Sequence, residues 1–124
     1  MRFPVPIAIY AGLLSLGAAC ASAQVAPERV AAPRAGIAAA KEAGADENPQ
    51  AALHLKLAND QFDRAKRMMN DGEPEDATRM LDRATVDAEL ALELARLDNT
   101  RRDAGDAMTN IQKLRQEHRM LKAE

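Results

Sequence analysis

The chain of 124 residues has 17 basic and 19 acidic side chains, a formal net charge of −2, and 2% aromatic residues. This length allows one domain at most, and the near-neutral charge excludes the strongly basic surface typical of nucleic-acid-binding proteins. The scarcity of aromatic residues argues against β-sandwich and α/β cores, whereas abundant Ala, Leu, Glu and Arg favour helix.

The first residues have the three parts of an export signal. Arg2 supplies a positive charge, residues 7–16 form a short apolar run, and small residues follow. The run is shorter than the roughly 20 apolar residues that span a bilayer. We therefore expect this segment to be removed during export rather than retained as a membrane helix.

Two cleavage sites compete at the end of this signal. Cleavage before Cys20, within a sequence similar to the lipobox of bacterial lipoproteins, would remove residues 1–19 and lipidate the only cysteine. Cleavage after Ala23, at the A-x-A pattern Ala21-Ser22-Ala23, would remove residues 1–23 and release a soluble protein. Gly17 replaces the usual large residue of a lipobox, but the position of the only cysteine favours lipidation. We expect a protein at the periplasmic face of the outer membrane or, with the second site, in the periplasm.

A tether and a short helix are expected next. Residues 20–33 are rich in Pro and Ala and predict a flexible tether ahead of a helical domain over residues 34–124. Residues 34–44 predict a short Ala-rich helix. Because an isolated helix of this length is marginal in water, it must dock through Ile37 and its alanines or fray.

Two longer helices are predicted to form an antiparallel hairpin. Asn48 is a good N-cap and Pro49 suits the first helical position, so one helix should cover residues 49–71 and end at Gly72. Pro74 begins the other after a link short enough to place the two helices side by side. Small residues that allow close approach dominate the expected interface, which comprises Leu57, Phe62, Ala65, Ala77, Leu81, Ala84, Ala88, Ala91 and Ala95.

The second hairpin helix is predicted to continue to about residue 122 as a coiled-coil-like rod, roughly 70 Å long. Gly105 weakens this helix but need not end it. The fold class is therefore all-α. The last half of the rod carries an apolar stripe that nothing else in the chain covers, and three bases lie on one face there; these residues are Met108, Ile111, Leu114 and Leu121, and Arg115, Arg119 and Lys122.

This stripe is a candidate surface for a second copy or for a partner helix. The three bases are most simply explained as an ordinary solvated helix face. As the functional alternative, they would suit an anionic surface or the acidic half of a second copy.

A family resemblance rests on the alanine pattern of the chain. The matching residues are the run 37–45, Pro49, Leu53, Ala58, Ala65, Gly72, Ala77, Leu81, Ala84 and the sequence Asp87-Ala88-Glu89-Leu90-Ala91. Together they resemble domain-of-unknown-function family 4398, a helical family of Gram-negative envelope proteins. The resemblance implies a cell-envelope protein, often a lipoprotein or the neighbour of an OmpA-like domain. No OmpA-like domain follows here, so a peptidoglycan-binding role is not carried over.

No constellation for chemistry is expected. His54 and His118 lie on different predicted helices without metal-ligand spacing, and the acidic residues are spaced as a solvated helix face. We expect no enzymatic activity, metal or cofactor. Two functional classes remain: a lipid-anchored structural or adaptor protein of the cell envelope, and a soluble periplasmic binding or chaperone-like module.

Overall fold

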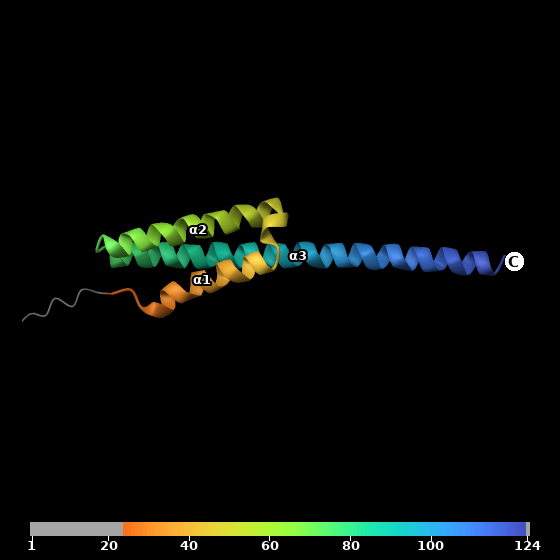
Figure 1. Ribbon diagram of the computed structural model, residues 1–124, viewed down its shortest axis with the longest axis horizontal. Helices are drawn as coiled ribbons and strands as arrows, with labels where there is room; N and C mark the ends of the chain where they lie inside the picture. Colours follow the sequence, from red (N-terminus) through yellow and green to blue (C-terminus); the bar gives the residue numbers. More distant parts are fainter. Residues whose placement is uncertain (1–23, 124) are drawn as a thin grey trace, which may run out of the picture.

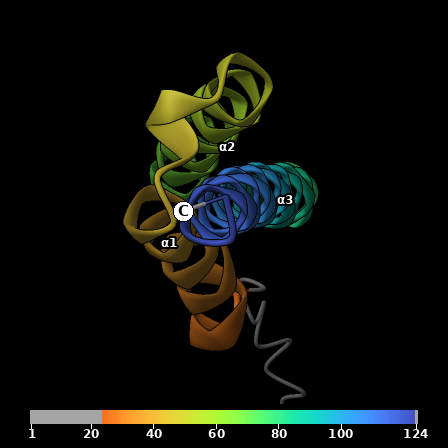
Figure 2. The same ribbon diagram turned by 90° about the vertical axis from the view of Figure 1, so that its right-hand side faces the viewer.

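Helices make up the described part of the chain, residues 24–123, in the computed structural model. α1 covers Pro27–Glu42, η1 is a 3₁₀ turn over Ala45–Glu47, α2 covers Pro49–Asn70, and α3 covers Pro74–Leu121. α1 and α2 lie along the first half of α3, whose second half projects alone (Figure 1). The end-on view shows α1 and α2 on different sides of α3 (Figure 2). The predicted all-α fold is confirmed.

The hairpin forms where the sequence predicts it. The Asn48 side chain accepts hydrogen bonds from the backbone N–H groups of Gln50 and Ala51, at 2.9 and 3.0 Å, and so caps α2. Gly72 adopts a positive φ of 80°, which suits glycine at the end of a helix. The observed bounds of α2 and α3 agree with the predicted ranges 49–71 and 74–122 to within one residue.

The first helix is longer than predicted. Residues 27–33, expected to belong to the tether, form the first turns of α1, and the helix ends at Glu42 rather than at residue 44. Pro27 fits the first turn, where no N–H is required. Pro33 lies inside the helix and removes one backbone hydrogen bond, but its ring is fully buried, which offsets part of that loss. Gly44, with φ of 81°, ends the helix. Residues 1–23, which include the predicted export signal and Cys20, lie outside the described part.

Small side chains dominate the core. Six α3 residues of the predicted interface are at most 1% exposed: Ala77, Leu81, Ala84, Ala88, Ala91 and Ala95. α1 contributes Pro33, Ile37 and Ala40, so of the two outcomes that the sequence left open, docking and fraying, the structure shows docking. Every buried residue of the described chain lies between Pro33 and Ala95. A chain of residues 24–124 therefore contains the whole core.

The predicted rotation of α2 is partly wrong. Ala65 is buried and Phe62 is half-buried, but Leu57 is 37% exposed. The face on α3 instead follows steps of four and three through Ala51, Leu55, Ala58, Phe62 and Ala65. Leu57 is two positions from Leu55, about 200° around the helix, and so lies outside this face. Alanine at three of the five positions lets α2 approach the alanine seam of α3 closely.

Candidate functional site

A polar contact between α2 and α3 fixes their register. The Asp87 carboxylate lies 2.8 Å from Nδ1 of His54 and accepts a 2.7 Å hydrogen bond from Nε2 of Gln61. The side chains of His54 and Asp87 are 28% and 19% exposed. Asp87 thus joins two residues of α2 that are seven positions, about two turns, apart to one point on α3. This contact was not predicted from the sequence. The signal that points toward it is the position of Asp87 directly beside Ala88 of the alanine seam.

Replacement of Asp87 by Ala should lower the free energy of unfolding by about 1–3 kcal/mol, because partly buried polar groups of His54 and Gln61 lose their partner. Urea denaturation of residues 24–124 followed by circular dichroism measures this change. Glu89→Ala is the matched control, since Glu89 is exposed two residues away. Equal stability of both variants would show that the contact does not support the helix pair.

α1 and α3 lie very close together at Gly36. A Cβ atom built on Gly36 would lie 3.0 Å from Cβ of Ala88, which is tighter than ordinary van der Waals contact. Ala88 is itself 0% exposed. Predicted as part of the α2–α3 seam, Ala88 therefore also lies against α1, and neither helix has room for a larger side chain there.

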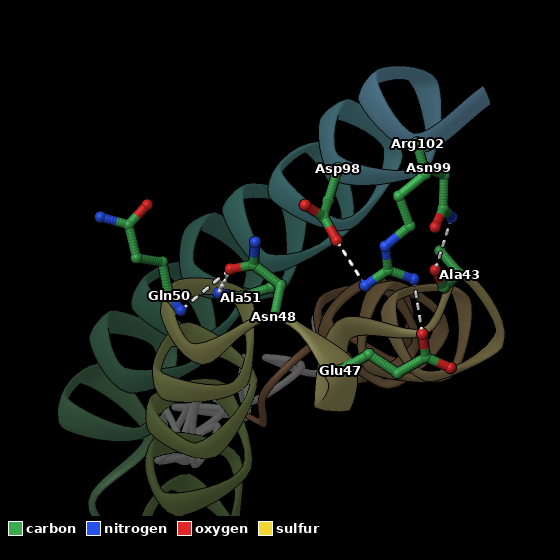
Figure 3. Close-up of polar contacts among 8 residues, drawn as sticks. All are labelled: Ala43, Glu47, Asn48, Gln50, Ala51, Asp98, Asn99 and Arg102. Carbon is green, nitrogen blue, oxygen red and sulfur yellow. Dashed lines mark hydrogen bonds and ion pairs between the residues drawn. The ribbon is translucent and has the colours of Figure 1, made fainter. Parts of the chain in front are cut away.

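A polar junction marks the place where α3 leaves the other helices (Figure 3). Arg102 pairs with Glu47 at 2.7 Å and with Asp98 at 2.6 Å, while Nδ2 of Asn99 donates to the carbonyl of Ala43 at 3.0 Å. The hydrogen bond to Glu47, together with the charge of Asp98, raises the pKa of Arg102 above its usual value, so it stays charged. The junction ties η1 and the end of α1 to α3.

Beyond Asp98 every described residue is exposed. Met108 is 67% exposed, Ile111 49%, Leu114 63% and Leu121 74%. The bases Arg115, Arg119 and Lys122 are also exposed. The structure thus places the whole predicted partner surface on an uncovered helix.

The described residues offer little for metal binding or membrane insertion. Between residues 24 and 123, no group of three or more His, Cys, Asp and Glu side chains is placed to hold a metal ion. No helix in the same range is long and apolar enough to cross a membrane. The candidate site that the geometry does offer is the uncovered surface of α3.

Comparison with known protein families identifies the family of this helical chain. The model of the family described as "Domain of unknown function (DUF4398)" matches residues 27–107. The chain belongs to the DUF4398 family. The match begins at the first residue of α1. It includes the contacts of α3 with α1 and with α2, and it ends beyond the polar junction at Arg102. Searches of curated proteins and of solved structures found no match to this chain.

The alanine pattern suggested this resemblance over about residues 37–96. The DUF4398 match confirms it and extends it by ten residues at the start and eleven at the end. We call α1, η1, α2 and the first half of α3, up to Asp98, the body. The family region therefore comprises this body and the first part of the projecting half of α3. The whole apolar stripe, which begins at Met108, lies beyond the family region.

Proposed function

We propose that this protein is a non-enzymatic adaptor or structural protein of the cell envelope. In this proposal the protein is exported, anchored to a membrane by lipid on Cys20, and presents the projecting half of α3 to a partner. The observation that carries the proposal is the exposed apolar stripe on a helix that nothing in the described chain covers. Single exposed apolar residues are common, but a row of them on a projecting helix is typical of an interaction surface.

The arrangement of the body supports the same function. α1 and α2 brace the first half of α3, and the Arg102 junction fixes the point where the free half begins. Because the seam is built mostly of alanine, the body offers closely packed helices rather than a cleft between them. In this proposal the body holds the projecting half of α3 in a fixed orientation.

Lipid attachment is supported by the sequence before the body. The only cysteine follows the apolar run of the export signal. Each buried methylene of an acyl chain contributes about 0.8 kcal/mol, so the two or three chains of a lipoprotein hold it firmly on a membrane. Six residues between Cys20 and Pro27 would then separate the anchor from α1.

The mature N-terminus tests the anchor. Mass spectrometry of the protein from its native host should find a chain that starts at an acylated Cys20, in the membrane fraction. The Cys20→Ser variant should lack the acyl chains, and it should either retain its signal or be cut elsewhere. An unmodified chain that starts at Gln24, equally soluble with and without the substitution, would reject the anchor and favour the soluble periplasmic module.

A further inference from the structure

One exposed face of α3 runs without interruption from the body onto the projecting half. Residues spaced by seven lie on the same face of a helix, and this spacing links Leu90, Leu97, Ala104, Ile111 and His118. Leu90, Leu97 and Ile111 are 41%, 46% and 49% exposed. The projecting stripe is thus the continuation of an apolar surface that begins on the body.

This face widens into a patch at each end. On the body, Gln61 of α2 and Val86 of α3 border one surface hollow. From Gln61, Leu57 and Leu53 follow at steps of four residues back along α2, and from Val86, Leu90 follows four residues on along α3. Because α2 and α3 are antiparallel, both steps lead in the same direction along the body. We define the body patch as Leu53, Leu57, Val86, Leu90 and Leu97, which are 37–64% exposed, and the tip patch as Met108, Ile111, Leu114 and Leu121.

We propose that the occupant of this face is a second copy of the chain, lying antiparallel and crossing at Ala104. The seven-residue row is symmetric about Ala104: Leu97 and Ile111 are each seven residues away, and Leu90 and His118 fourteen. An antiparallel pair therefore places Ile111 of each copy on Leu97 of the other. Each tip patch then covers a body patch, and the two contacts are related by twofold symmetry.

Charge favours the antiparallel orientation. Residues 24–97 contain fourteen acids and ten bases, whereas residues 107–122 contain four bases, Lys113, Arg115, Arg119 and Lys122, against Glu117. A parallel pair would bring the basic tips together. An antiparallel pair brings each basic tip to an acidic body, and such complementarity selects the orientation of partners.

The centre of the pair is made of the smallest residues. Ala104 and Gly105 follow each other in the exposed part of α3, and nothing lies within 4 Å of a Cβ built on Gly105. Glycine in a helix interior costs roughly 0.5–1 kcal/mol relative to alanine, and no contact in the described chain accounts for it. A second helix crossing here would use the space, since small residues let helix backbones approach closely.

The inference deepens the proposed function and rests on it for the use of this face as an interface. α3 extends thirty residues from Pro74 to Ala104. The two outer ends of the bodies would therefore lie about 90 Å apart, at 1.5 Å per residue. α1 starts near that outer end of the body (Figure 1), where Arg29 pairs with Asp82 at 2.9 Å. The two N-terminal tethers would emerge at opposite ends of one rod.

Disulfide trapping tests the orientation with residues 24–124, which lack Cys20. Single cysteines are introduced as Leu97→Cys in one sample and Ile111→Cys in another, and both are oxidised alone and as an equal mixture. The proposal expects mainly the mixed 97–111 disulfide, identified by mass spectrometry, and little product from either variant alone. Disulfides formed mainly within each variant alone would indicate a parallel pair and overturn the proposal. A yield of the mixed 97–111 disulfide no higher than that obtained with Lys113→Cys, on the opposite face, would also overturn it.

Sedimentation equilibrium tests whether both patches are needed. We expect a dimer at micromolar concentration, with Kd raised about tenfold or more by Leu90→Asp and equally by Ile111→Asp. Thr109→Asp is the control, because it adds the same charge at an exposed position two residues, about 200° around the helix, from Ile111. A monomer at every concentration, or a dimer sensitive to only one substitution, would overturn the proposal. The anchor is tested separately by the mature N-terminus. If residues 24–124 form the dimer but the native protein carries no lipid, the proposed anchor is rejected and the proposed pairing stands.

Discussion

Replacement of Ala88 by Leu is expected to lower the free energy of unfolding by about 1–3 kcal/mol or more, among the largest effects of any single substitution in this chain. Ala88 is fully buried at the point where α1 crosses α3, and a Cβ on Gly36 would already lie 3.0 Å from its own Cβ. Three additional carbon atoms have no space between two backbones. Either α1 must leave α3, or the alanine seam must open.

Urea denaturation of residues 24–124 measures this loss, with circular dichroism as the probe. Ala107→Leu is the matched control: it makes the same change on the same helix, where Ala107 is exposed. The control should keep the stability of the parent chain. Similar stability for Ala88→Leu would mean that α1 does not pack on α3 as described.

Replacement of Leu81 by Ala should cost about 2–5 kcal/mol, because it removes one of the largest fully buried side chains and leaves a cavity. Leu81 is 1% exposed in a seam that is otherwise mostly alanine. Its neighbours have short side chains with little freedom to move into the space. The loss should therefore lie toward the upper part of that range.

Leu114→Ala makes the same change where the side chain is 63% exposed, and should leave the monomer's stability within about 0.5 kcal/mol. Thermal unfolding of the two variants under one set of conditions gives the comparison. If both lose stability equally, the assignment of the core to the first half of α3 is wrong.

The sequence predicted the hairpin because each of its boundaries depends on local chemistry. Asn48 caps α2, Pro49 and Pro74 fit the first positions of their helices, and Gly72 takes the positive φ. The alanine spacing then identified the buried side of α3. These features depend on neighbouring residues in the chain, so they can be found without knowing the packing.

The errors arose where packing decided the outcome. Pro33 suggested a tether, but burial against the core keeps it inside α1. The sequence analysis places Leu57 in the interface, yet alanine at positions 51, 58 and 65 sets the rotation of α2 and turns Leu57 outward. The contact of Asp87 with His54 and Gln61 depends on that rotation and on the register of two helices, so the sequence did not show it.

The proposed function depends above all on the uncovered face of α3 binding a partner in the envelope. A photo-crosslinking amino acid placed at Ile111 in the native host tests it most directly, with the same probe at Lys113, on the opposite face, as control. We expect a strong crosslinked product from Ile111, to a second copy or to another envelope protein, and little from Lys113. Absence of any product from Ile111, or equal yields at both positions, would contradict it.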